Sequence, residues 1–167
     1  MLGEYKQQQP QQQREQKIFL NIKQGAIVKK TPTGEEKYSF VEGSVENIFR
    51  WQRTFRGEAV EYWYIELRDE EGDLYSLGFS YRSNLFKSLI LSLASAQDLS
   101  RIKIKPYTAN GYDKVVVYES DKKLDWACSS LPPVEIVSVG GQQVKDDSKR
   151  MGLIVSLVDQ IKAKINR

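Results

Sequence analysis

A short run, Arg50-Trp51-Gln52-Arg53-Thr54-Phe55-Arg56-Gly57, combines the side chains that hold an unpaired nucleic-acid strand. It carries three guanidinium groups, two large aromatic rings and no carboxylate. Guanidinium groups pair with phosphate in a planar fork. Aromatic rings stack on unpaired bases, which contributes about 1–3 kcal/mol per base. The run therefore predicts either a single-stranded nucleic-acid surface or a solvated hairpin whose Trp51 and Phe55 pack on the core.

The chain offers few candidate residues for a metal site, a catalytic site or a phosphate-binding loop. It has no histidine and one cysteine, Cys128, so the usual zinc site of Cys and His ligands cannot be built and the commonest general base is missing. The acidic pairs Glu70-Glu71 and Asp146-Asp147 are interpreted as turn and cap residues rather than as a two-metal site. Gly140-Gly141 predicts a turn, because no Gly-Lys-Ser/Thr follows it. We therefore expect no catalytic residue, no metal and no cofactor.

The composition predicts a globular protein of one domain with tails. The chain has 167 residues, of which 40% are hydrophobic and 28% charged. The net charge of +3 is too small to indicate a nucleic-acid partner by itself. Residues 61–100 carry three Lys/Arg against seven Asp/Glu, whereas residues 1–60 carry ten against seven and residues 101–167 twelve against eight. This segregation leaves room for a local positive groove.

The cellular location is expected to be the cytoplasm, of a bacterium or of a phage-infected host. The single cysteine fits a reducing compartment. No apolar segment typical of a signal peptide is visible near the N-terminus, and no apolar run reaches the roughly 18 residues of a membrane span. Residues 1–16 are dominated by glutamine, which predicts a disordered arm.

Hydrophobic periodicity predicts several strands and two helices. In the segment 61–68, Tyr62 and Tyr64 alternate with Trp63 and Ile65, as in a strand with one buried face. A stripe with a four-residue repeat predicts a helix over 83–96, capped by Ser83 or Asn84. The other expected strands are 18–30 with a bulge at Gly25, 37–55 with a bend at Gly43, 74–82, 101–107 and 113–119; the segment 122–145 is expected to be irregular and residues from about 149 to 165 helical.

This order of elements favours a mainly β fold. Five-stranded Greek-key barrels of the oligonucleotide/oligosaccharide-binding type (the OB-fold) carry one helix between their third and fourth strands. The expected fold is an OB-fold-like barrel of this kind plus a C-terminal helix, with strand 1 near 18–30 or 37–49. The run 50–56 would then be the loop into strand 2, which flanks the binding face in such folds. The alternative is an α+β sheet with one helix packed across it.

Three runs resemble OB-fold single-stranded DNA-binding proteins of phages and mobile elements. They are Tyr62-Trp63-Tyr64-Ile65-Glu66-Leu67-Arg68-Asp69, Tyr75-Ser76-Leu77-Gly78-Phe79-Ser80-Tyr81-Arg82-Ser83 and Phe86-Lys87-Ser88-Leu89-Ile90-Leu91-Ser92-Leu93-Ala94-Ser95. The hairpin from Lys105-Pro106-Tyr107 to Val117-Tyr118 and the following Trp126-Ala127 add to the resemblance, which covers about residues 37–130. The resemblance implies binding and protection of single strands in replication or recombination.

The expected organisation is a disordered arm at 1–16, an OB-fold domain that binds single-stranded nucleic acid at 17–130, and a linker with an amphipathic helix at 131–167. The expected nucleic-acid-binding residues are Arg50, Trp51, Arg53, Phe55, Arg56, Tyr62, Tyr64, Arg68, Lys103, Lys105, Tyr107, Tyr112 and Lys114. For each of them the competing interpretation is structural. Tyrosines favour strands, and alternating lysines often guard a sheet edge.

The leading hypothesis is a non-enzymatic protein that coats single-stranded DNA, or RNA, largely without sequence preference. The alternative is a protein-interaction or assembly module that uses the sheet face and the C-terminal helix. That helix could pack on its own domain, mediate self-association or contact replication proteins. A nuclease or other enzyme is the weakest of the three hypotheses, because the chain lacks histidine and a convincing carboxylate cluster. No membrane partner is expected.

Overall fold

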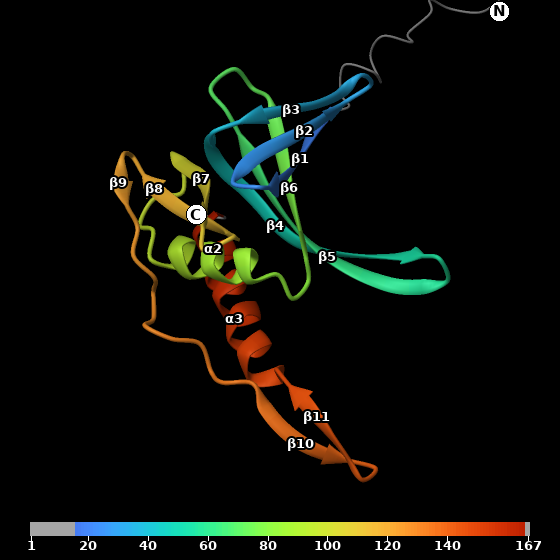
Figure 1. The fold of residues 1–167 in the computed structure, drawn as a ribbon. Coiled ribbons are helices and arrows are strands. Elements are labelled where there is room, and N and C mark those ends of the chain that lie inside the picture. Colours follow the sequence, from blue (N-terminus) through green and yellow to red (C-terminus); the bar gives the residue numbers. More distant parts are fainter. Residues whose placement is uncertain (1–15, 166–167) are drawn as a thin grey trace, which may run out of the picture.

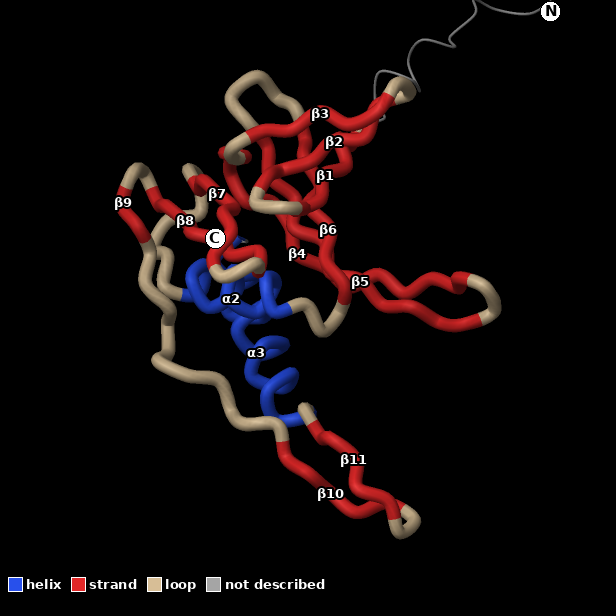
Figure 2. The backbone as a smooth tube through the Cα atoms, viewed as in Figure 1, coloured by secondary structure: helices blue, strands red, loops and turns tan. Residues whose placement is uncertain are grey.

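The computed structural model describes residues 16–165. The predicted glutamine-rich arm therefore lies outside the described residues, apart from Gln16. The described chain is mainly β, with two helices (Figures 1 and 2). The elements are β1 (Lys17–Lys23), β2 (Ala26–Thr31), β3 (Gly34–Tyr38), β4 (Val41–Phe55), β5 (Glu58–Arg68), β6 (Leu74–Ser80), α2 (Asn84–Ala94), β7 (Ile102–Ala109), β8 (Tyr112–Glu119), β9 (Lys122–Lys123), β10 (Glu135–Val139), β11 (Gln142–Asp146) and α3 (Ser148–Ile165).

Nine strands form one mixed sheet in the order β3-β2-β1-β6-β5-β4-β7-β8-β9. Neighbouring strands are antiparallel except β1 and β6, which are parallel. The sheet curls until the turn between β1 and β2 meets the β7–β8 hairpin, where the Gly25 N–H donates to Asp113 Oδ1 at 2.6 Å. No strand ladder joins β2 to β7 among the described residues. The expected closed five-stranded barrel is therefore replaced by a curled sheet that does not close.

Strand β4 connects the two parts of the sheet. Its first residues, Val41 to Gly43, pair with β7, and the rest, from Ser44 onward, pairs with β5. A Cβ at Gly43 would lie 2.6 Å from the carbonyl oxygen of Arg68, a distance that only a residue without a side chain permits. The predicted bend at Gly43 is thus where β4 changes its partner. A β-bulge between Val45 and Asn47 follows it.

The outer parts of β4 and β5 project from the sheet as a two-stranded arm (Figure 1). Strand β6 ends beside β5 at the pair Tyr62–Ser80, so residues 51–61 form the β4–β5 arm. Its turn places Arg56 and Gly57 at φ values of 52° and 79°, as a two-residue hairpin loop of type I′ requires. The run 50–56, predicted to be a loop before strand 2, is instead mostly the end of β4.

Both helices pack against the same hydrophobic core. The Ser83 side chain caps α2 by accepting the Phe86 N–H at 3.2 Å, as predicted, and the Phe86 ring stacks on Trp63 at 4.8 Å. The apolar stripe of α3, which includes Ile154 and Ile161, is buried in this core. The stripe predicted from the sequence therefore packs on its own chain. Of the helices in residues 16–165, neither is long and apolar enough to cross a membrane.

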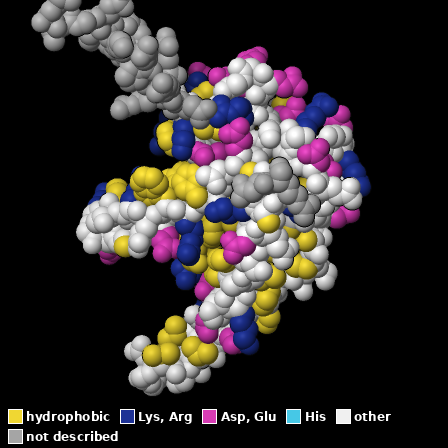
Figure 3. All heavy atoms as spheres, turned by 180° about the vertical axis from the view of Figure 1, so that it is seen from behind, with side chains coloured by type: hydrophobic (Ala, Val, Ile, Leu, Met, Phe, Trp, Pro, Cys, Tyr) yellow, Lys and Arg dark blue, Asp and Glu magenta, His cyan; other side chains and the backbone are white. Residues whose placement is uncertain are grey.

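Two sequence expectations about the strands are wrong. The segment 18–30 is a hairpin of two strands, because Gln24 and Gly25 have positive φ and reverse the chain there. The segment 122–145 contains the short β9 and a separate hairpin, β10–β11, whose turn is the predicted Gly140-Gly141. This second hairpin also projects from the body, and hydrophobic side chains gather on both projections in Figure 3.

An ion pair fixes the start of α3 and makes stability depend on pH. Arg82 Nε donates to Asp147 Oδ2 at 2.8 Å. This hydrogen bond, together with the charges of Arg82 and Lys87, lowers the pKa of Asp147 below its ordinary value. Because the pKa is lower in the folded state, the pair adds stability above the unfolded pKa. That contribution is lost as the pH falls through the folded pKa.

Asp147→Asn is expected to lower the free energy of unfolding at pH 7 by about 0.5–1 kcal/mol, since Arg82 is largely exposed to solvent. The loss should shrink as the pH falls through the lowered folded-state pKa of Asp147. Urea unfolding at pH 7 and at low pH measures both values. Asp159→Asn, at an exposed position of α3, is the matched control and should change little; an equal loss in the two variants would contradict the role of the pair.

Candidate nucleic-acid interface

One face of the sheet carries a row of aromatic rings. Paired residues on antiparallel strands point to the same side, and β4 and β5 pair Phe49 with Tyr64 and Trp51 with Tyr62. The opposite side of β5 is core, with Trp63 3% exposed. The predicted alternation along 61–68 is therefore confirmed. We call the solvent side the aromatic face; its members are Phe19, Phe49, Trp51, Arg53, Phe55, Tyr62 and Tyr64.

Three of these rings are exposed without packing on the core. The exposed fractions are 62% for Phe19, 54% for Trp51 and 55% for Phe55. Hydrophobic packing on the core, the structural explanation for Trp51 and Phe55, is thereby excluded. Scattered exposed hydrophobic residues are normal, but a gathered apolar surface indicates an interaction site. The arm therefore exposes its large rings to solvent rather than packing them on the core.

Further along the row the rings contact one another. Phe49 and Tyr64 stack with centroids 5.5 Å apart and an interplanar angle of 24°, and Tyr62 lies 6.4 Å from Tyr64. A Cβ at Gly78, on the neighbouring strand β6, would lie 3.0 Å from Tyr64 Cε1. The missing side chain lets the Tyr64 ring lie against the sheet. The face is thus a shallow aromatic surface.

Cationic groups are interleaved with these rings. The Arg53 guanidinium lies 4.9 Å from the Tyr62 centroid, and the Arg56 guanidinium lies 5.2 Å from that of Phe55. The Lys17 ammonium lies 5.4 Å from the Phe49 centroid and 2.6 Å from the Glu66 carboxylate. Glu66 is itself buried on this face, and Lys17 balances its charge. The exposed part of the face therefore combines rings with guanidinium groups.

A small cavity lies in the middle of the aromatic face. It has a volume of about 240 Å³, and its walls include Phe19, Arg53, Tyr62, Tyr64 and Ser80. The wall thus offers flat rings, one cation and one hydroxyl group. Such a cavity can receive a flat, partly polar group between a ring and a guanidinium.

The structure does not bring Arg50 to this face. Arg50 pairs with Trp63 across the two strands and therefore points to the opposite side. Its guanidinium lies 5.6 Å from the ring centroids of both Trp63 and Tyr81. It donates to the Tyr81 hydroxyl at 3.4 Å and lies 4.0 Å from the Glu61 carboxylate. Of the three arginines in the run, Arg53 and Arg56 accompany the exposed rings, whereas Arg50 covers the edge of the core.

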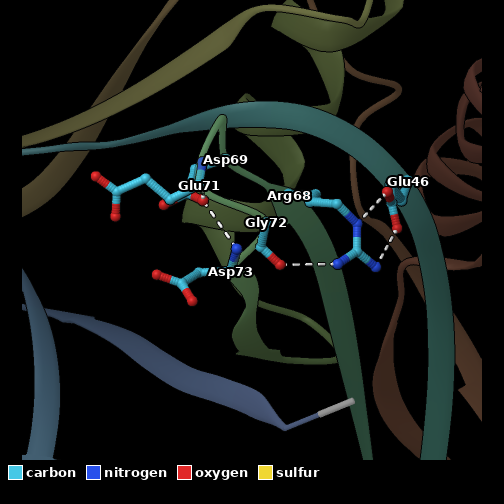
Figure 4. A network of polar contacts seen from close by, with 6 residues as sticks. All are labelled: Glu46, Arg68, Asp69, Glu71, Gly72 and Asp73. Atoms are coloured by element: carbon cyan, nitrogen blue, oxygen red, sulfur yellow. Dashed lines mark hydrogen bonds and ion pairs between the residues drawn. The ribbon is translucent and has the colours of Figure 1, made fainter. Parts of the chain in front are cut away.

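Arg68, at the other end of β5, is held in a polar network (Figure 4). Its Nε and Nη2 donate to the two carboxylate oxygens of Glu46 at 2.6 and 3.1 Å, and its Nη1 donates to the Gly72 carbonyl at 2.9 Å. The Asp69 carboxylate orders the same turn by accepting the N–H groups of Glu71 and Asp73. These contacts give Arg68 a structural role beside the turn 69–73, and they confirm that these acidic residues are turn residues.

The remaining predicted binding residues lie on the β7–β8 hairpin. Lys105 pairs with Val116, Tyr107 with Lys114 and Ala109 with Tyr112, so the side chains of these lysines and tyrosines share one side of the hairpin. On the same side, the Lys103 ammonium lies over the rings of Phe40 and Tyr118. Strand β4 separates this hairpin from β5 in the sheet order, and Figure 1 shows the β4–β5 arm projecting in another direction. The predicted residues therefore form two groups.

Four residues of the aromatic region were not predicted from the sequence: Lys17, Phe19, Phe49 and Gly78. Phe49 lies two residues before Trp51, so the period of two along β4 was a usable signal. Phe19 and Lys17 reach the face only because β1 pairs in parallel with β6. No local pattern indicates that pairing. No protein-family model, curated protein or solved structure matches this chain.

Proposed function

We propose that this protein binds single-stranded DNA through the aromatic face, without catalysing a reaction and largely without sequence preference. One observation carries the proposal: Trp51, Phe55 and Phe19 are exposed on the same side of the sheet as Tyr62 and Tyr64, with Arg53 stacked among them. Every base has a π-face, so a row of rings holds successive unpaired bases whatever their identity. The role would be to coat and protect the strand.

Phosphate contacts would come from the cationic groups beside the rings. Arg53 and Arg56 extend from the arm at the level of the exposed rings. A guanidinium can stack on a ring and still direct its N–H groups to a phosphate. Lys103 and the exposed Tyr112, which lie on the same side of the β7–β8 hairpin, would continue the path of the backbone. The strand would then run from the arm across the curled sheet.

An OB-fold-like arrangement is part of this proposal. The order β4, β5, β6, α2, β7, β8 supplies five strands with one helix between the third and the fourth. The pairing of β4 with both β5 and β7 supports its assignment as the first strand. The arrangement departs from an OB-fold at β6, which pairs with β1 rather than with β8, the last of the five strands. The aromatic face would then correspond to strands 2 and 3, which form the binding face of OB-folds.

The proposal is tested by fluorescence anisotropy with a labelled dT oligomer at 50 and 200 mM salt. For a single strand, the logarithm of the affinity falls by about 0.7 per tenfold increase in salt for each phosphate that the protein neutralises. Contact with about three to five phosphates should therefore weaken binding roughly 20- to 130-fold over this range. A matched U oligomer and a DNA duplex measure the preference among nucleic acids. Absence of binding, or an affinity that does not change with salt, would contradict the proposal.

A further inference from the structure

A second concave surface lies between α2 and the free edge of β8, away from the aromatic face. This cavity has a volume of about 840 Å³. Lys87 and Leu91 of α2 line one side, Lys105 and Lys114 of β7 and β8 line another, and Trp126 lies at a third. Figure 1 shows α2 beneath the β7–β8 hairpin. We call this space the α2–β8 groove.

One edge of β8 has no strand partner along the α2–β8 groove. β8 pairs with β7 along its whole length, but with β9 only at Tyr118 and Glu119. The Val117 carbonyl accepts the Leu124 N–H at 2.9 Å on the side away from β7. Because backbone groups alternate along a strand, those of Asp113 and Val115 point to this same side. Among residues 16–165 no strand pairs with them, and unpaired edge groups of this kind are a template for another strand.

The groove is positively charged, and one of its lysines has a largely buried side chain. Lys87 is 6% exposed as a residue. Its ammonium has no hydrogen bond or salt bridge within the described part of the chain, but it is not fully removed from solvent. Burial, together with the charges of Arg150 and Arg82, lowers its pKa, against the opposite effect of Asp147. Lys105, Lys114 and Lys123 add positive charge along the walls, against Asp113 and Asp125. Because the Lys87 ammonium has no partner in the described part of the chain, it is free to donate to an incoming carboxylate, and hydrogen bonds between charged groups are the stronger ones.

We propose that the α2–β8 groove binds an extended acidic peptide of a partner protein, which adds as a strand to the free edge of β8 and places a carboxylate at Lys87. The peptide backbone would exchange N–H···O=C bonds with Asp113 and Val115, as in other cases of strand addition. Valine and leucine side chains of the groove would receive apolar side chains of the peptide. The proposal does not depend on the binding of DNA.

A peptide fits this surface better than a nucleic-acid strand because of the hydrogen-bonding groups along the edge. The free edge of β8 offers donors and acceptors in alternation, and phosphates can satisfy only the donors. A peptide with acidic side chains on one side and apolar side chains on the other satisfies both the edge and the lysines.

The test uses fluorescein-labelled eight-residue peptides that alternate valine with glutamate or valine with lysine, measured by anisotropy. The glutamate peptide should bind and the lysine peptide should not. Lys87→Met should weaken the glutamate peptide about tenfold, in line with the loss of a hydrogen bond to a charged group. The melting temperature of this variant should stay close to that of the wild type, because no hydrogen bond or salt bridge of Lys87 within residues 16–165 is lost. Lys145→Met, at an exposed position of β11, should leave the affinity unchanged.

Amide hydrogen exchange on the wild-type protein gives a second readout that needs no variant. The glutamate peptide should slow the exchange of the Asp113 and Val115 amides, while those of the β4–β5 arm stay unaffected. The proposal is overturned if the glutamate peptide fails to bind, if Lys87→Met binds it as well as the wild type does, or if these amides gain no protection. Displacement of the peptide by a dT oligomer at equal affinity would also overturn it, by making the groove a nucleic-acid site.

Discussion

Trp51→Ala is expected to weaken binding of a dT oligomer by about 1–3 kcal/mol, the range for one stacked base, which is roughly a 5- to 150-fold loss of affinity. Trp51 is 54% exposed and pairs with Tyr62 across the arm, so its ring is available to a base and contributes little to the core. The melting temperature should therefore stay close to that of the wild type. Anisotropy titration and thermal unfolding measure the two quantities.

Two other tryptophans provide the controls for this result. Trp126 is 50% exposed but lies in the α2–β8 groove, so Trp126→Ala should leave DNA affinity unchanged. Trp63 is buried under α2, so Trp63→Phe should lower stability and change affinity little. A larger loss of affinity in either control than in Trp51→Ala would show that the strand binds elsewhere.

Gly43→Ala is expected to lower the free energy of unfolding by about 1–3 kcal/mol, the usual cost of forcing extra atoms into a packed site. The added Cβ would lie 2.6 Å from the Arg68 carbonyl oxygen and 2.9 Å from its carbonyl carbon. Both are backbone atoms, so no side chain can move aside. β4 and β5 would have to separate at the point where β4 turns towards β7. Urea unfolding measures the change.

Gly152→Ala is the matched control for the Gly43 variant. Gly152 is exposed within α3, and nothing lies within 4 Å of the position of an added Cβ. Alanine is favoured over glycine inside a helix by roughly 0.5–1 kcal/mol, so this variant should be more stable than the wild type. If Gly43→Ala were as stable as the wild type, the backbones of Gly43 and Arg68 could not lie as close together as described.

Elements with a clear local period could be predicted from the sequence. The alternation in 61–68 predicted which side of β5 is buried, and Trp63 confirms it. The Ser83 cap and the four-residue stripe predicted α2. Gly140-Gly141 predicted a turn, and both residues have positive φ. In each case the relevant interactions lie within a few residues of one another, so the local sequence carries the signal.

Features set by distant pairings could not be predicted. The expected closed barrel failed because β6 pairs in parallel with β1, which precedes it by more than fifty residues. The same pairing brings Phe19 to the aromatic face. Arg50 and Arg53 are three residues apart, so any strand places them on opposite sides; only the pairing of β4 with β5 shows that the side of Arg50 is the side of Trp63. The β10–β11 hairpin was missed because its strands are short and mostly exposed.

The central claim is that bases stack on Trp51, and intrinsic tryptophan fluorescence tests it most directly. In a Trp126→Phe variant the emission comes from exposed Trp51 and buried Trp63. Titration with unlabelled dT oligomer should quench this emission to a plateau, with the same Kd that anisotropy gives. Adding Trp51→Phe should abolish most of the quenching. Tight binding that leaves the emission of the Trp126→Phe variant unchanged would contradict the account.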